Sequence, residues 1–401
     1  MRKVRPVKKT EMTPRDRVMA ALNHQEPDRV PIALAQATGD GITLVAYQNL
    51  LKHLGMGDLK AQVKDTRGQT AKVDEAVLQR FRVDFRGVGL GAADQGQDRW
   101  LDERTFEDEW GVVRTRPPGA YYYDLVGSPL AGDATLEAIE RHRWPDPHDP
   151  GRFRGLKEKA RHLHQETDYA VVVDLNCAFF LRCCELRGWE TFYMDLVANV
   201  EFAEALMDHY LNLRLAMAER ALQEVGENVD IMMVTSDDLG MTDRTLISPA
   251  LYRSLIKPRQ KRTFDFFRAR TGAKLYFHTD GAIYPLIPDL IEIGTEVLNP
   301  IEVSAVGMGD TWQMKRDFGA KLTFWGAIDT RRVLPHGTPA EVREEVRRRI
   351  LDLGPGGGYV VSPVHNIQPD VPPQNIVAMY DAAYELGRYP LSPDYSRKLR
   401  E

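Results

Sequence analysis

The strongest constraint in this sequence is a series of eight short apolar runs, most of them followed by a long amphipathic segment. The runs cover residues 29–35, 83–90, 169–175, 230–235, 274–278, 296–301, 322–328 and 358–364. Short runs of this kind indicate buried strands, whereas apolar residues spaced three and four apart indicate helices. Strand and helix alternating eight times predict an α/β fold, a single closed (β/α)8 barrel domain over residues 1–401. An open doubly wound sheet is the weaker alternative, because the order shows no evident reversal.

Two segments depart from the strand and helix alternation. A helical extension is predicted to begin at Thr13-Pro14, since threonine caps helix amides and proline is tolerated in a first turn. Later helices are predicted over 189–224, 249–270, 283–293, 311–318, 339–353 and 372–386. The segment 92–130 contains FEDEWGVVRTR and AYYYDL around a Pro-Pro-Gly turn, which indicates an antiparallel insertion after the second strand, at the catalytic end of the barrel.

The amino-acid composition limits which binding partners and which cellular compartment can be expected. The chain has 401 residues, 43% of them hydrophobic and 28% charged, with a net charge of -5 that offers no positive field for nucleic acid. Cys177, Cys183 and Cys184 make a disulfide framework implausible, because adjacent cysteines would form a strained bridge. No run approaches the roughly 18 apolar residues of a membrane span, and none follows the basic start. We expect a cytoplasmic protein with a small-molecule substrate and no membrane association; the oligomeric state is left open, with a homodimer as one option.

Polar residues gather where the predicted strands end. In a (β/α)8 barrel these positions face the active site. In chain order they are Asp84, Asp174, Asn176, Asp237, Asp238, His278, Asp280, Asn299, Glu302, Asp329, His365 and Asn366. Within this set we expect Asn176, Asn299, Glu302 and Asn366 to bind substrate.

His278, Asp280 and His365 form the candidate metal site. Imidazole and carboxylate are zinc ligands, and Gly281 permits the turn that aims His278 and Asp280 at one cavity. His365 follows the eighth strand, which adjoins the first in a closed barrel. The structural alternatives are that Asp280 caps the helix near Ile283 and that both histidines hold loops.

Other candidates carry weaker signals. Asp237 or Asp238 could complete a metal shell, orient a ligand histidine or act as general acid or base, and adjacent acids can equally be solvated. Cys177 is interpreted as a buried thiol rather than a soft metal ligand. The glycine-rich stretch 354–358 precedes a strand, so we interpret it as a helix stop rather than a phosphate cradle.

Several of these segments together resemble a known family. MTPRDRVMAALNHQEPDRVPI, DDLGMTDRTLISPALYRSLIKP, LYFHTDGAIYPLIPDLIEIGTEVLNPIEV, KLTFWGAIDT and GGGYVVSPVHNIQPDVPPQNIVAMYD look like the uroporphyrinogen decarboxylase superfamily, from about Met12 to Tyr380. The resemblance implies a (β/α)8 barrel and one of two chemistries. These are cofactor-free porphyrinogen decarboxylation and zinc-dependent methyl transfer involving a corrinoid or a thiol.

Departures from both patterns favour the methyltransferase-like branch. The arginine-rich segment that binds porphyrinogen carboxylates in decarboxylases is replaced by residues 35–39, AQATG. A tyrosine expected after the third strand is also absent, although Asp84 and His365 resemble the decarboxylase aspartate and late histidine. The methyltransferases of the family bind zinc through His-x-Cys and a later cysteine, whose places Asp280 and His365 take beside His278. Imidazole and carboxylate are harder ligands than thiolate, so a metal held by them is suited to polarising a methylated oxygen or nitrogen.

The resemblance therefore implies Zn²⁺ at His278, Asp280 and His365, and a corrinoid (cobalamin) on a partner protein that accepts the methyl group. The alternative is a decarboxylase in which Asp84 is catalytic and no metal is needed. A non-catalytic corrinoid- or tetrapyrrole-binding protein is a third hypothesis, from another class of function.

Overall fold

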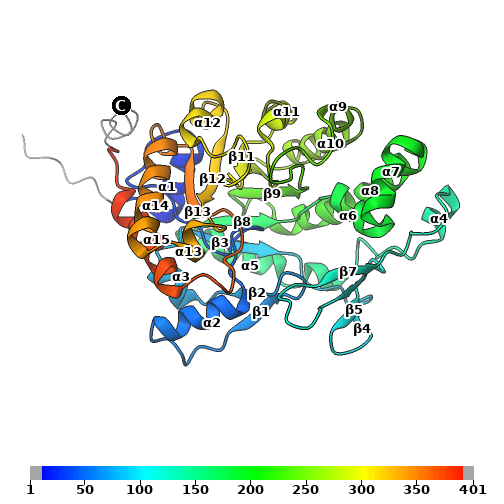
Figure 1. Cartoon of the computed structure of the whole chain (residues 1–401), viewed down its shortest axis with the longest axis horizontal. Helices are drawn as coiled ribbons and strands as arrows, with labels where there is room; N and C mark the ends of the chain where they lie inside the picture. The colour runs from blue at the N-terminus through cyan, green and yellow to red at the C-terminus, as the bar shows by residue number, and fades with distance from the viewer. Residues whose placement is uncertain (1–10, 392–401) are drawn as a thin grey trace, which may run out of the picture.

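Seven parallel strands form the centre of the molecule. A computed structural model describes residues 11–391; most of the basic start lies outside them. The strands are β3 (Phe85–Gly89), β8 (Ala170–Asp174), β9 (Ile231–Ser236), β10 (Lys274–His278), β11 (Val297–Asn299), β12 (Thr323–Ile328) and β13 (Tyr359–Pro363). Their spatial order, β13-β12-β11-β10-β9-β8-β3, follows the chain without reversal (Figure 1). This order is that of a (β/α)8 barrel and not of a doubly wound sheet.

The first predicted strand, 29–35, is not regular. Ile32 forms one parallel bridge to Val361, and the amide of Ala33 donates to the carbonyl of Val361 at 3.0 Å. On its other side, the amide of Asp84 donates to the carbonyl of Ile32 at 3.0 Å. Pro31 cannot donate to a ladder, so the segment pairs only locally. It nevertheless joins β13 to the start of β3, and with the seven regular strands it completes the barrel.

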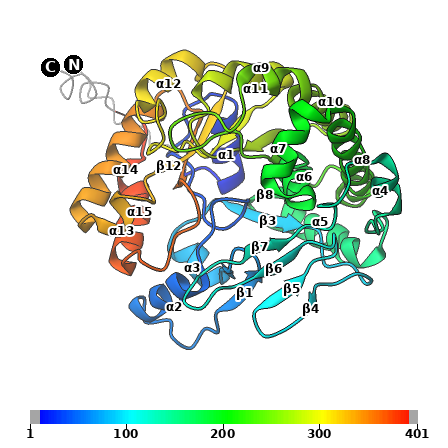
Figure 2. The same ribbon diagram turned by 45° about the vertical axis from the view of Figure 1, so that its right-hand side comes forward.

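Helices surround these strands as a ring (Figure 2). The ring-forming helices are α5 (Leu156–Glu166), α6 (Phe180–Arg187), α7 (Trp189–Ala198), α8 (Val200–Val225), α9 (Pro249–Leu251), the π-helical turn η2 (Tyr252–Ile256), α10 (Lys257–Arg268), η3 (Tyr284–Leu286), α11 (Ile287–Ile293), α12 (Thr311–Phe318), α13 (Val333–His336), α14 (Pro339–Leu353) and α15 (Pro373–Leu386). The predictions 311–318 and 339–353 match α12 and α14. At α14 the local reason is a capping box, in which Thr338 and Glu341 satisfy each other's amides.

Helix α1 (Pro14–Leu22) confirms the predicted extension and covers the amino ends of the strands. The Thr13 hydroxyl accepts from the amide of Asp16, as a capping threonine should. Val18 and Leu22 pack into the barrel interior with Phe85 and Trp325, among other side chains. Since α1 closes this end, the functional residues have to be sought at the carboxyl ends.

The insertion after β3 is a four-stranded antiparallel sheet. Its strands are β4 (Arg99–Trp100), β5 (Thr105–Glu107), β6 (Val113–Thr115) and β7 (Asp124–Gly127), paired in that order. They lie outside the ring of helices, beside an unpredicted hairpin of β1 (Gln62–Asp65) and β2 (Thr70–Lys72) (Figures 1 and 2). The remaining short helices are α2 (Leu44–His53), α3 (Glu75–Arg80), α4 (Leu136–Arg141) and η1 (Pro150–Phe153). Between residues 11 and 391, no helix has the length and apolarity that crossing a bilayer requires.

Candidate metal centre

His278, Asp280 and His365 converge at the carboxyl ends of β10 and β13. Each offers a ligand atom, and these three atoms lie within 4.8 Å of one another. Both Nε2 of His278 and Nε2 of His365 lie 3.7 Å from Oδ2 of Asp280. These distances are too long for hydrogen bonds, so the groups face one another without bonding. The structure thus brings together all three residues predicted as metal ligands.

Two neighbours orient the His278 ring. Asn299, at the end of β11, places Oδ1 2.6 Å from Nδ1 of His278, while its Nδ2 donates to the carbonyl of Trp325 at 3.3 Å. Because the amide nitrogen of Asn299 is used in this way, Nδ1 of His278 is the donor, and Nε2 is the ring nitrogen that faces Asp280. Gly39 packs on the ring: a Cβ there would lie 2.4 Å from Cε1 of His278, and its φ of +89° also favours glycine.

The turn that carries Asp280 is fixed from both sides. The amide of Asp280 donates to Oδ1 of Asp238 at 3.1 Å, and the amide of Gly281 donates to Oε2 of Glu302 at 2.7 Å. Gly281 has a φ of +92°, and a Cβ there would lie 2.3 Å from the carbonyl carbon of Gly240. Arg331 in turn pairs with Oε1 of Glu302 at 2.9 Å. Glu302 therefore supports the turn, whereas substrate binding was predicted for it.

The side chains at the centre surround a space at the carboxyl ends of the strands, which we call the recess. Those of Asp238, Asp280 and His365 are 35%, 27% and 40% exposed, whereas that of His278 is 4% exposed. Burial lowers the pKa of His278, but Asp280 and Asp238 outweigh it and raise this pKa to about 9. Burial, followed by repulsion from Asp280, raises the pKa of Asp238 to about 7. Burial also raises the pKa of Asp280, yet the two histidines outweigh it and leave that pKa below its usual value.

Three other predicted residues support loops at the same strand ends. Asp237 is fully buried and accepts from the amides of Leu181 and Phe179 at 3.1 and 3.3 Å, so it caps the start of α6. Oδ1 of Asn176 accepts from the amide and the hydroxyl of Ser236 at 3.1 and 2.9 Å. Oδ1 of Asn366 accepts from the amide of Gly41 at 2.9 Å. Since Asp237 is turned toward α6, Asp238 is the acid of the pair that faces the recess.

The expected position of Asp84 at this rim is wrong. Asp84 precedes β3, at the amino end of the barrel, where it is 1% exposed. Its carboxylate accepts from the guanidinium of Arg17 at 2.7 Å and from that of Arg29 at 2.8 Å. It also accepts from the amide of Ile32 at 2.8 Å. These bonds tie the extension α1 and the irregular first segment to the barrel, which is a structural task.

Some residues near the centre were not predicted to have a role there. Gly39 and Arg331 lie in loops whose contacts only the fold reveals, and neither belongs to a motif. Cys177 is buried, as interpreted, and burial raises the pKa of its thiol to about 12. It donates weakly to the carbonyl of Arg214 at 3.7 Å, and it is not part of the metal group.

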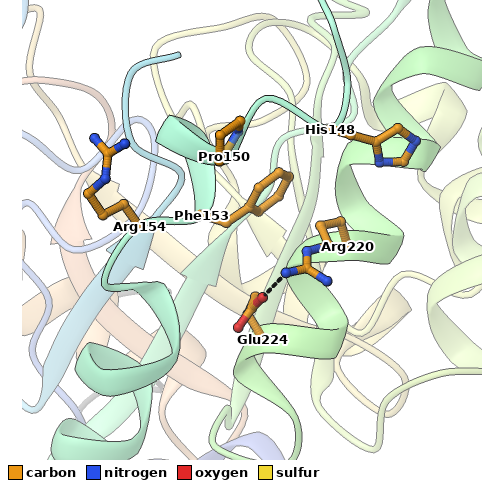
Figure 3. A pocket seen from close by; sticks show the side chains of 6 residues that line it. All are labelled: His148, Pro150, Phe153, Arg154, Arg220 and Glu224. Atoms are coloured by element: carbon orange, nitrogen blue, oxygen red, sulfur yellow. Dashed lines mark ion pairs between the residues drawn. The ribbon is translucent and has the colours of Figure 1, made fainter. Parts of the chain in front are cut away.

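A separate hollow of about 440 Å³ lies between the η1 region and α8 (Figure 3). Its lining residues come from the η1 region and from α8, and none of them ends a barrel strand: His148, Pro150, Phe153, Arg154, Arg220 and Glu224. Arg220 and Glu224 pair with each other, and Phe153 fills the space between the two elements (Figure 3). The hollow offers no cluster of ligand atoms comparable to the strand-end recess.

Comparisons with known proteins agree with the barrel. The family model for uroporphyrinogen decarboxylase (URO-D) matches residues 126–386. A uroporphyrinogen decarboxylase of Legionella pneumophila strain Corby is 31% identical over 94% of this chain and 97% of its own length. One from Alkalilimnicola ehrlichii is 32% identical, but over a segment that spans 24% of this chain and 26% of that relative.

A solved structure shares the fold at lower identity. A methyltransferase from Methanosarcina mazei superposes with a TM-score of 0.61 and 17% identity, covering 94% of this chain and 99% of its own. The match to the family model, together with the full-length relative, identifies the chain as a member of the uroporphyrinogen decarboxylase (URO-D) family.

Proposed function

We propose that this protein is a zinc-dependent methyltransferase or demethylase, which moves a methyl group from an O- or N-methylated small molecule to a corrinoid protein. The convergence of His278, Asp280 and His365 carries the proposal. The methyltransferase from Methanosarcina mazei adds that this fold is used for methyl transfer. Residues 35–39 contain no arginine. This favours methyl transfer over decarboxylation of a porphyrinogen, a substrate whose several carboxylates would need cationic partners.

The three side chains fit a zinc ion. Ligand atoms around a tetrahedral zinc lie roughly 3.3 Å apart, given bonds of about 2.0–2.1 Å. The two separations to Asp280 are 3.7 Å, a few tenths of an ångström wider, and all three ligand atoms lie within 4.8 Å of one another. Binding zinc would therefore require side-chain rotations that draw the two histidines closer together. Oδ1 of Asp280 is buried and accepts no hydrogen bond from any residue between 11 and 391. The carboxylate therefore remains available to coordinate a metal ion. A bound zinc would supply Lewis acidity toward the heteroatom that carries the methyl group.

The chain's own residues would prepare this chemistry. Asn299 holds the His278 ring so that Nε2 points into the recess. Glu302 and Asp238 hold the turn that presents the Asp280 carboxylate. Asp238 uses Oδ1 for this purpose, which leaves its Oδ2 to exchange a proton with the substrate. Asp238 is therefore the proposed general acid for the demethylated heteroatom.

Zinc analysis and a transfer assay test the proposal together. Purified protein should contain zinc near one equivalent, and it should form methylcobalamin from free cob(I)alamin and a methoxyarene or methylated amine. His278→Ala should lose both zinc and transfer. His336→Ala removes an exposed histidine from α13 and should lose neither.

Cofactor-free decarboxylation of a tetrapyrrole or related acid is the alternative, favoured by the names of the relatives. Release of CO₂ from uroporphyrinogen by zinc-free protein, without methyl transfer to any cob(I)alamin mixture, would replace the proposal by this alternative.

A further inference from the structure

Asp174 ends β8 in the same recess, and it has fewer partners than comparable acids of this protein. Its Oδ2 accepts one hydrogen bond, from the hydroxyl of Thr38 at 2.8 Å. No ion pair to Asp174 occurs within residues 11–391, and Oδ1 is not among the atoms sealed off from solvent. Burial raises the pKa of Asp174, so the surroundings do not satisfy its charge.

Several other acids of the barrel are paired with cations or amides. Asp84 has two arginines and an amide, and Asp195 has Arg187 and Asn199 at 2.6 and 2.7 Å. Asp289 has Arg253 and Lys257 at 2.9 Å. Asp174, by contrast, is held by one hydroxyl, and its Oδ1 is open to solvent. This oxygen is therefore available to accept a hydrogen bond from a ligand.

Asp174 lies next to the metal centre. Thr38 contacts Asp174 through its hydroxyl, and Gly39, the next residue, packs on the His278 ring. Tyr276, in the strand that carries His278, donates its hydroxyl to the carbonyl of Thr38 at 3.4 Å. Asp174 and His278 thus contact the same two-residue segment, and the charge of His278 acts on Asp174. Asp174 is therefore a neighbour of the metal centre at the carboxyl ends of the strands.

We propose that Asp174 is a substrate-recognition residue, and that the substrate carries a hydrogen-bond donor, an amine or a hydroxyl, at the end remote from the methyl group. The orientation of the methylated end rests on the proposed function, but the binding partner of Asp174 does not. Three cationic side chains act on Asp174 through their charges, Lys64, Arg214 and His278, but none of them is paired with it within the described residues. A substrate with an anionic remote end would be repelled by the carboxylate.

Binding measurements without any corrinoid test this inference separately from methyl transfer. The probes are para-methoxybenzylamine, para-methoxybenzyl alcohol and the methyl ether of that alcohol, which has no donor. Calorimetry on the purified protein should show the amine or the alcohol binding about 10- to 100-fold tighter than the ether, the range for a hydrogen bond to a charged group. Asp174→Ala should abolish this difference.

The variants also distinguish recognition from a structural role. Asp174→Ala should keep or raise the melting temperature, because it removes a partly buried charge that has a single hydrogen bond. Asp243→Asn removes the same charge from an exposed loop after β9 and should leave the preference unchanged. Equal binding of the three probes by the wild type, or an Asp174→Ala variant that retains the preference or unfolds, would overturn the inference. Probe binding without methyl transfer would instead count against the proposed function alone.

Discussion

Asn299 offers the sharpest single test of how the metal centre is built. Its Oδ1 accepts from Nδ1 of His278 at 2.6 Å, and the residue is fully buried. Loss of an outer partner of a ligand histidine costs 10- to 100-fold in metal affinity, which is about 1.4–2.7 kcal/mol. Asn299→Ala should therefore weaken zinc binding by that factor, because the imidazole loses its fixed tautomer and orientation.

Competition between the protein and a calibrated chelator measures the zinc affinity of each variant. Asn299→Asp keeps an acceptor at the same place and should retain the affinity or improve it. Asn375→Ala is the matched control: Asn375 is 1% exposed and donates to the carbonyls of Leu334 and Gly337, away from the centre. The reasoning fails if Asn299→Ala binds zinc as tightly as Asn375→Ala does.

Three further predictions concern other parts of the structure. Gly39→Ala should displace the His278 ring, so we expect at least a tenfold loss of zinc affinity in the same competition assay and a visible ring shift in a crystal structure. Burial lowers the pKa of Lys315 from 10.5 to about 8, so folding stability should rise as the pH increases from 8 to 10.5, by at most about 3 kcal/mol. Denaturant unfolding across that range should show the rise in the wild type and not in Lys315→Met. Asp84→Asn should destabilise the fold by about 3–5 kcal/mol, because buried Arg29 loses its carboxylate partner and buried Arg17 keeps only Asp28. Zinc content per folded protein should stay unchanged; a loss of zinc with full stability would contradict this assignment.

Much of the barrel was predictable because its signals are local. Apolar runs and helical spacing depend on neighbouring residues, so seven strands, α1 and helices such as α14 could be predicted from them. His278, Asp280 and His365 could be selected because polar residues at strand ends have one common direction in this fold. The (β/α)8 prediction is confirmed by the strand order and the family match.

The wrong position of Asp84 and the open choice between Asp237 and Asp238 both depended on contacts between distant segments. Asp84 lies at the boundary of its run, and only Arg17 and Arg29 reveal that it belongs to the amino end. Asp237 and Asp238 have the same side chain, and the direction in which the chain leaves β9 decides which one faces the recess. These outcomes depend on tertiary geometry that residue type alone does not encode.

The first predicted strand failed for a local reason. Pro31 cannot donate, and Ala35 adopts a φ of +57°, so the run 29–35 pairs through single bridges although its apolar pattern is that of a strand. The contact between Gly39 and the His278 ring depends on this irregular path, and it could not be read from the sequence.

X-ray absorption at the zinc edge of the purified protein tests the central claim most directly. The account predicts zinc bound only by nitrogen and oxygen, with the outer-shell scattering of imidazole rings, and loss of that signal in His278→Ala. A protein that binds no zinc when supplied with it, or zinc with a sulfur ligand at about 2.3 Å, would contradict the claim.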